Sequence, residues 1–348
     1  MHDPVDEVIA SQAPQDARHV WILDRPALLE AARPWSPVHL WCDDLRDRGV
    51  VPDDMLANPW TTDLAPHHVW MGLPRSLDAL DETLSVLHGL AARHGAEDLH
   101  VVAGARIRHM NRSANEVARR WFDEVWASRG LGKARALHFR GPRARPARGA
   151  GWPRRQRHDD LGIEVVAHGG VFHTAGLDAG TALLLDHLDE ALADHEEGGG
   201  VVDLGCGNGI IAAAAARHGG GPVTATDVSW LAADSARLTA RANGLEVEVL
   251  TGDGLTALAD GSADLVLTNP PFHRGTAKES RPTYRMLADA ARVLRPGGHL
   301  WCVFNSHLPW GEHLDATVGP TRQVARTRGY TLTCTTATHT TAPKGAPR

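Results

Sequence analysis

The segment at residues 201–209 reads Val-Val-Asp-Leu-Gly-Cys-Gly-Asn-Gly, and it decides the fold class of the second half of the chain. Residues 201–204 have the apolar character of a buried strand, and the helical stretch 210–218 follows the last glycine directly. Glycines let the backbone turn sharply and approach a ligand, while the free N–H groups at a helix start favour electron-rich ligand groups. The order of strand, glycine loop and helix therefore predicts a ligand-binding loop in an α/β domain.

The next predicted strand, 223–227, indicates which kind of ligand the loop binds. It ends in Asp227, whose carboxylate can accept hydrogen bonds from both hydroxyls of a ribose. The glycines are spaced as GxGxG, one residue shorter than the GxGxxG fingerprint of dinucleotide-binding proteins, and the chain contains no GK[ST] phosphate loop. These features predict a nucleoside-type ligand and argue against a nucleotide held by its phosphates.

This pattern resembles the first two motifs of class I S-adenosylmethionine (SAM) methyltransferases. On that resemblance SAM is the cofactor, and Asp227 binds its ribose. Asp253, in the turn Thr251-Gly252-Asp253-Gly254, would lie beside the adenine. The resemblance implies the following cofactor-binding residues: Asp203, Gly205, Gly207, Gly209, Asp227 and Asp253.

Strand and helix patterns alternate through the rest of the second half. Strands are predicted at 246–251, 263–268 and 299–304, and helices at 231–243 and 283–294. Such alternation is typical of a doubly wound, Rossmann-like parallel sheet.

The segment Asn269-Pro270-Pro271-Phe272 follows strand 263–268, at the sheet edge where such folds bind ligands. An amine attached to an aromatic ring is a poor nucleophile because its lone pair is delocalised into the ring. The Asn269 side-chain oxygen and the Pro270 carbonyl can each accept one N–H bond, which orients the amine and favours its rehybridisation. Proline fixes φ and so holds the carbonyls rigidly, while Phe272 offers a flat face on which a base can stack. We therefore predict that Asn269, Pro270, Pro271 and Phe272 form the catalytic segment.

This tetrapeptide alone leaves three acceptors open: adenine N6, guanine N2 and the amide of a protein glutamine. The longer stretch from Asn269 to Gly275 resembles the extended motif of bacterial ribosomal RNA guanine-N2 methyltransferases. So does the segment 170–180, which in that family precedes the SAM motif and lies over the cofactor. The resemblance makes Phe172 and Asp178 further cofactor-binding candidates.

The first half also alternates, with predicted strands at 19–23, 39–42, 69–72, 100–103 and 136–139 and predicted helices at 76–94 and 115–128. The family carries a degenerate methyltransferase copy ahead of the active one. Here the loop Leu23-Asp24-Arg25-Pro26-Ala27 has no glycine, and Gly72-Leu73-Pro74 stands where Asn-Pro-Pro would be required. The resemblance thus implies two tandem Rossmann-like class I methyltransferase domains, the N-terminal one silent. Segments 73–77 and 103–106 favour the large-subunit branch of the family.

The distribution of charge supports a division into two parts. The 348 residues carry a net charge of −6, yet residues 129–158 hold ten Arg and Lys residues and no acidic residue. The segments before and after this basic stretch each carry a net charge of −8. An anionic partner is expected at such a stretch. We predict a degenerate domain at 1–142, a basic linker at 143–158, the catalytic domain at 159–335 and a flexible tail at 336–348.

Several classes of protein are excluded by the sequence. The longest apolar run, 210–216, is far shorter than a membrane span, and the N-terminus has no apolar signal region. Four scattered cysteines form neither a disulfide framework nor a metal knuckle, and the 21 histidines show no metal-ligand spacing. We expect a cytoplasmic protein that binds no metal and no membrane and acts as a monomer.

These inferences together predict SAM-dependent methyl transfer to the exocyclic N2 amine of a guanine in ribosomal RNA, free or within a ribosomal subunit. One alternative keeps the enzyme but changes the acceptor to adenine N6 of a nucleic acid or to a protein glutamine amide. Another is a non-catalytic ribosome-assembly factor that only binds RNA.

Overall fold

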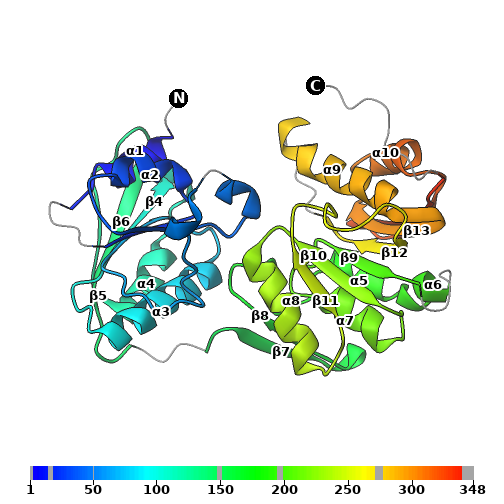
Figure 1. Ribbon diagram of the computed structural model, residues 1–348, viewed down its shortest axis with the longest axis horizontal. Coiled ribbons are helices and arrows are strands. Elements are labelled where there is room, and N and C mark those ends of the chain that lie inside the picture. Colours follow the sequence, from blue (N-terminus) through cyan, green and yellow to red (C-terminus); the bar gives the residue numbers. More distant parts are fainter. Residues whose placement is uncertain are drawn as a thin grey trace. The chain divides into compact units, whose positions relative to one another are not determined.

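In the computed structural model, which describes residues 3–14, 19–49, 51–146, 151–193, 199–270 and 277–338, the chain divides into two units, Met1–Pro153 and Arg154–Arg348. Each unit contains its own sheet with helices on both faces (Figure 1). The division falls inside the basic stretch 129–158.

The sheet of the second unit has seven strands in the order β11-β10-β9-β12-β13-β15-β14. Its strands are β9 (Val201–Leu204), β10 (Val223–Asp227), β11 (Glu248–Thr251), β12 (Ala263–Thr268), β13 (Leu294–Asn305), β14 (Thr321–Arg326) and β15 (Tyr330–Thr336). Strands β9 to β13 are parallel, and β14 and β15 are antiparallel. The strand order reverses between β9 and β12, where Leu204 pairs with Thr268. This pairing brings the residues after the two strands, Gly205 and Asn269, to one sheet edge.

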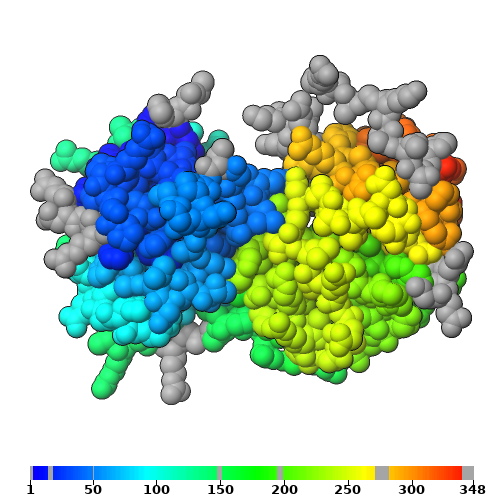
Figure 2. Space-filling view, viewed as in Figure 1, coloured from blue at the N-terminus to red at the C-terminus, as the bar shows by residue number. Residues whose placement is uncertain are grey.

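Helices cover both faces of this sheet. They are α5 (Ala179–Leu185), α6 (Leu188–Ala193), α7 (Ile210–Arg217), α8 (Trp230–Ala242), α9 (Ala277–Val293) and α10 (Trp310–Thr317). The alternation of side chains along β12 serves both faces: Leu265 and Leu267 pack with α7, and Val266 packs with α9 and α10. Figure 1 shows α7 and α8 on one side of the sheet and α9 and α10 on the other. In Figure 2, α8 (yellow-green) forms part of the surface that faces the viewer.

The first unit repeats this topology with one strand fewer. Its strands are β1 (Val20–Leu23), β2 (Val38–Trp41), β3 (His68–Gly72), β4 (His100–Arg106), β5 (Phe122–Ala127) and β6 (Ala134–Pro142), in the order β2-β1-β3-β4-β6-β5. Its helices are α1 (Pro4–Ala10), α2 (Leu29–Ala32), α3 (Leu77–His94) and α4 (Arg112–Trp121). By position, β1 corresponds to β9, β3 to β12 and β4 to β13. The place of β11 is taken by a single bridge between Leu40 and Leu56.

The predicted helix at 115–128 is wrong in its second half. Helix α4 ends at Trp121, and Phe122 begins β5, an edge strand paired with β6. Neither glycine nor proline marks this boundary. Phe122 simply leaves the helical region, at φ −126° and ψ 146°, because its backbone bonds to a strand twelve or more residues further along the chain.

The basic segment 143–158, predicted as a linker, is partly folded. Arg154–His158 forms β7, which pairs antiparallel with β8 (Ile163–Ala167) in the second unit. Before it, Trp152 donates a hydrogen bond to the buried Asp81 in the first unit. Residues 147–150, which precede Trp152, lie outside the described part. The predicted tail begins within β15, at Thr336, and its residues from 339 on are also outside the described part.

Candidate active site

The glycine loop between β9 and α7 needs glycine at three positions. Gly205, Gly207 and Gly209 have φ of 75°, 53° and 77°, in the left-handed region that side chains disfavour. A Cβ on Gly209 would also lie 2.6 Å from the Cα of Ala236 in α8, whereas one on Gly207 would meet no atom closer than 4.0 Å. Gly209 therefore lets two helices approach each other, and Gly207 leaves space on the loop surface.

Asp203 lies beneath this loop and is fully buried. Its Oδ2 accepts a hydrogen bond from the backbone N–H of Ala212 at 3.0 Å. Its Oδ1 is buried without a partner among the described residues. Burial raises the pKa of Asp203 to about 7; the bond from Ala212 opposes this rise, and the charge of Asp227 adds to it. A buried acceptor without a partner is costly, so Oδ1 suits a donor supplied by a bound ligand.

Asp227, at the end of β10, joins the glycine loop to the turn before α8. Its two carboxylate oxygens accept bonds from the N–H groups of Gly207, at 3.0 Å, and Ser229, at 2.9 Å. The next strand is connected as well, because the Gly252 N–H donates to the Asp227 carbonyl at 2.8 Å. The exposed Asp253 follows in that turn. Asp227 and Asp253 thus lie on adjacent strand ends, next to the glycine loop.

The Asn269 side chain is held in one orientation. Its Nδ2 lies 3.2 Å from each carboxylate oxygen of Asp178 and 3.0 Å from Oγ1 of Thr181. A carboxylate can only accept, so the nitrogen of the amide must face Asp178, and Oδ1 is left to accept other bonds. Asp178 itself is buried and caps α5 through the N–H groups of Gly180 and Thr181. The structure thus places Asp178, a predicted cofactor residue, against the predicted catalytic Asn269.

The segment before Asp178 lies over the glycine loop. Asn208 donates from Nδ2 to the carbonyls of Thr174 and Gly176, both at 3.0 Å. Phe172 lies in this segment and is 72% exposed, with its ring edge-on to His173 at a centroid distance of 4.4 Å. Sequence reasoning missed the roles of Asn208 and Thr181. The signal for Asn208 was a donor side chain placed between two loop glycines.

The predicted catalytic segment is only partly described. Asn269 is half-buried and Pro270 is buried, directly after β12, whereas Pro271 and Phe272 lie outside the described residues. Met286 of α9 comes close to the glycine loop, because a Cβ on Gly205 would lie 3.2 Å from its Cε. One edge of the sheet therefore brings together the glycine loop, Asp227, Asp178 and Asn269.

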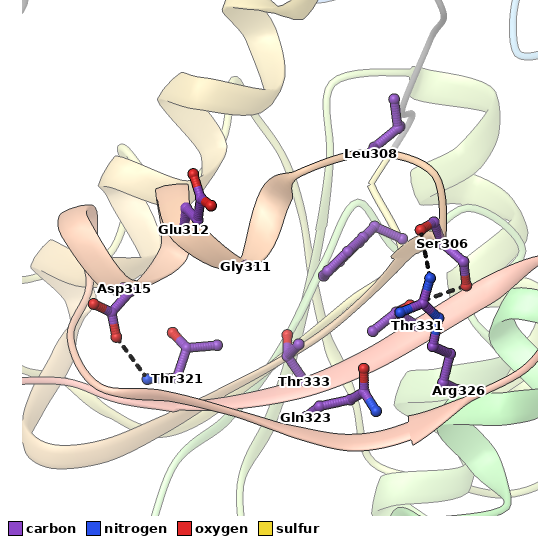
Figure 3. A pocket seen from close by; sticks show the side chains of 11 residues that line it. Ser306, Leu308, Gly311, Glu312, Asp315, Thr321, Gln323, Arg326, Thr331 and Thr333 are labelled. Carbon is purple, nitrogen blue, oxygen red and sulfur yellow. Dashed lines mark hydrogen bonds between the residues drawn. The ribbon is translucent and has the colours of Figure 1, made fainter.

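A separate pocket of about 420 Å³ lies between α10 and strands β14 and β15 (Figure 3). Several of its polar groups are bonded within the protein. Arg326 donates to the Ser306 carbonyl at 3.2 Å, and Asp315 accepts from the Thr321 N–H at 3.1 Å. None of the predicted site residues lines it.

Comparison with known proteins identifies the family. The family model of the methyltransferase small domain matches residues 162–334, and that of the RLMG N-terminal domain matches residues 48–143. The ribosomal RNA large subunit methyltransferase G of Pseudomonas syringae pv. syringae is 32% identical over 321 residues, covering 88% of this chain and 83% of the relative. The chain belongs to the ribosomal RNA large subunit methyltransferase G family.

Another methyltransferase G, from Ectopseudomonas mendocina, is 37% identical over 262 residues, which is 74% of this chain and 67% of that protein. These relatives confirm the resemblance noted in the sequence and its large-subunit branch. The T. thermophilus 16S rRNA N2 methyltransferase RsmC, solved with AdoMet and guanosine, has a TM-score of 0.77 at 22% identity over 96% of this chain and 92% of its own. This match extends over both units and confirms the predicted fold of two tandem Rossmann-like domains.

No helix in the part of the chain that the structure describes is long and apolar enough to cross a membrane. Within the same ranges, no group of three or more His, Cys, Asp or Glu side chains is arranged to hold a metal ion.

Proposed function

We infer that the second unit transfers the methyl group of SAM to the exocyclic N2 amine of a guanine in large-subunit ribosomal RNA. The observation that carries this inference is the fixed amide of Asn269, which lies beside the glycine loop with its oxygen available to accept a bond. Family membership supports the ribosomal RNA substrate.

The residues around the glycine loop fit SAM. Asp203 has a buried oxygen without a partner among the described residues, and Gly207 leaves open space above the loop. The Asp227 carboxylate keeps further lone pairs for ribose hydroxyls beside its bonds to the loop. Asp253 would lie beside the adenine, and Phe172, exposed on the overlying segment, would cover the bound cofactor. SAM supplies an electrophilic methyl group on its sulfonium.

Asn269 and Pro270 would hold the acceptor. The Asn269 Oδ1 and the Pro270 carbonyl each accept one N–H bond from the guanine amine, which directs the nitrogen lone pair at the methyl group. Pro271 would keep this carbonyl rigid, and Phe272 would stack on a base flipped out of its helix. No dedicated general base is required, because the methylated amine is acidic enough to lose its proton to water.

The first unit is filled at the place that corresponds to the cofactor site. Arg25, in the loop after β1, donates to Asp6 and Asp3 at 2.7 and 2.8 Å and lies over Gly72 at the end of β3. Arg25 thus occupies the loop that corresponds to the glycine loop after β9, so the first unit would serve to position RNA. The protein would work as a monomer in the cytoplasm, where ribosomal subunits are assembled.

The test is a map of N2-methylguanine in ribosomal RNA from cells with and without this protein. We expect one large-subunit position to lose the modification and to regain it with the wild-type chain but not with Asn269→Ala. A map without any lost N2-methylguanine would refute the proposal. Labelled SAM incubated with RNA, DNA and protein fractions separates the alternative acceptors, adenine N6 and glutamine. Normal complementation by Asn269→Ala would favour a non-catalytic assembly factor.

A further inference from the structure

Basic side chains gather at the carboxyl edge of the first sheet. We call this group the arginine edge and define it as Arg75 after β3, Arg106 and Arg108 at the end of β4, and Lys133 in the turn between β5 and β6. Arg75, Arg108 and Lys133 are exposed, and Arg106 is partly exposed. The turn is fixed against the end of β4, because the Ile107 N–H donates to the Lys133 carbonyl at 3.0 Å.

The positive charge of this edge is largely uncompensated. The chain has no acidic residue between Asp98 and Glu116 or between Glu124 and Asp159. Asp3 is shared between Arg25, at 2.8 Å, and Arg106, at 3.5 Å. Among the residues that the structure describes, no ion pair holds Arg75, Arg108 or Lys133.

The charges act on a common neighbour. Slight desolvation and the charges of Arg108, Arg75 and Arg106 lower the pKa of His109, which follows β4. Because β3 and β4 pair in parallel, with Gly72 opposite Gly104, the residues that follow the two strands lie at the same edge of the sheet. A field of one sign over several exposed side chains attracts polyanions.

The shape of this edge suits an extended anion. Arg25 is held in the loop after β1 by Asp3 and Asp6, and the charges of the arginine edge lie on the exposed surface. Exposed apolar side chains accompany them: Ile107 is 48% and Leu131 44% exposed, and a Cβ on Gly130 would lie 3.6 Å from Cδ1 of Ile107. Sugars and bases can cover such apolar groups while the arginines contact phosphates.

We propose that the arginine edge binds the phosphate backbone of the RNA substrate, at strand ends that correspond to those of β12 and β13 in the second unit, where Asn269 lies. This assignment rests on the proposed function for the class of partner. It divides the molecule into a second unit that performs the chemistry and a first unit that supplies affinity for RNA through Arg75, Arg106, Arg108 and Lys133.

The test is a charge reversal in the full chain, Arg75→Glu with Arg108→Glu and Lys133→Glu. The matched control is Arg33→Glu with Arg93→Glu and Arg119→Glu. The control changes the net charge by the same amount as the edge variant. Its three positions are exposed and lie near the ends of α2, α3 and α4, where these helices reach the opposite edge of the sheet. Binding to transcribed large-subunit ribosomal RNA is measured by fluorescence anisotropy over a series of salt concentrations, and SAM binding is measured in parallel.

We expect the edge variant to bind RNA at least about tenfold more weakly than the control. The slope of log affinity against log salt should fall by about two to three, at roughly 0.7 to 0.9 per lost phosphate contact. SAM affinity should stay unchanged in both variants. Equal losses in the two variants, or none in either, would overturn the proposal. The proposal would also be overturned if the edge variant bound naked RNA normally but no longer bound assembled subunits, since this result indicates a protein partner.

Methylation of the same transcript by the wild-type chain keeps the two proposals apart. If the wild type produces N2-methylguanine but the edge variant binds RNA normally, only the arginine edge is refuted. If the wild type binds the RNA through the edge and no N2-methylguanine forms on naked RNA or on subunits, the proposed function is refuted.

Discussion

The amide nitrogen of Asn269 lies 3.2 Å from both carboxylate oxygens of Asp178, although 91 residues separate the two in the sequence. Because a carboxylate cannot donate, this contact determines which end of the amide faces away from Asp178. Thr181 reinforces it with a hydroxyl 3.0 Å from the same nitrogen. The Asn269 Oδ1, which would accept a hydrogen bond from the guanine amine, is therefore positioned by two residues at the start of α5, Asp178 and Thr181.

Asp178→Asn should lower kcat by about tenfold or more, because an amide at position 178 can donate to Asn269 and allow its side chain to flip. SAM affinity should change little. Asparagine also caps helices well, so the free energy of unfolding should fall by less than about 1 kcal/mol. Stopped-time methylation assays and calorimetric SAM titrations measure the two effects. Thr181→Ser keeps the hydroxyl and serves as the control. A large loss of SAM affinity with unchanged kcat would make Asp178 a cofactor residue instead.

Asn208→Asp should weaken SAM binding by roughly tenfold, because a carboxylate cannot donate to the carbonyls of Thr174 and Gly176 and would repel both. Asn243→Asp is the matched control. Asn243 also donates to two carbonyls, those of Glu164 and Thr239, but away from the glycine loop. Both variants should lose stability, and only Asn208→Asp should lose SAM affinity by isothermal titration. Equal SAM affinities in the two variants would contradict the role given to the overlying segment.

Gly209→Ala should destabilise the second unit by at least about 2 kcal/mol. Alanine is strained at φ 77°, and its Cβ would come 2.6 Å from the Ala236 backbone. Gly252→Ala is the control, since no atom lies within 4 Å of a Cβ there. Denaturant unfolding followed by tryptophan fluorescence and circular dichroism should show a lower midpoint for the first variant alone. An unchanged midpoint in Gly209→Ala would mean that α7 and α8 separate at little cost.

The buried Asp203 should make stability depend on pH. Its pKa is raised to about 7, above the unfolded value of 3.8, so the folded protein binds this proton more tightly than the unfolded chain. The stabilisation of the folded state by this bound proton is therefore complete below about pH 4, and it is lost as the pH rises through about 7. The difference in unfolding free energy between wild type and Asp203→Asn, measured without SAM, should change by a few kcal/mol across this range. A difference that is constant with pH would show that Asp203 is not titrating there.

Much of the second unit could be predicted from the sequence because its signals are local. Val201–Leu204, Val223–Asp227 and Ala263–Thr268 form strands with the predicted bounds. Each is a short run rich in β-branched or apolar residues, and a glycine or a polar residue lies at or directly after its end, which strand composition and turn residues suffice to locate. The family motifs lie on these strand ends, so the predicted positions of the glycine loop and Asn269 followed from the strands.

The remaining features depend on partners that are distant in the sequence. Arg154–His158 is a strand of charged and polar residues, and only its pairing with β8 makes it one. The boundary at Phe122 depends on β6 in the same way. The contact of Asp178 with Asn269 joins two motifs that each had an independent interpretation, and no local pattern indicates that they meet.

The loop after β1 has a consequence for the history of the duplicated fold. Restoring glycines at Asp24 and Arg25 alone would not recreate a second catalytic centre, because Gly72-Leu73-Pro74 still stands where Asn-Pro-Pro would be required. Reversion would need the loss of the ion pairs of Arg25 with Asp3 and Asp6 together with a new segment after β3. Such a combination is out of reach of single substitutions, so the two copies are committed to different tasks.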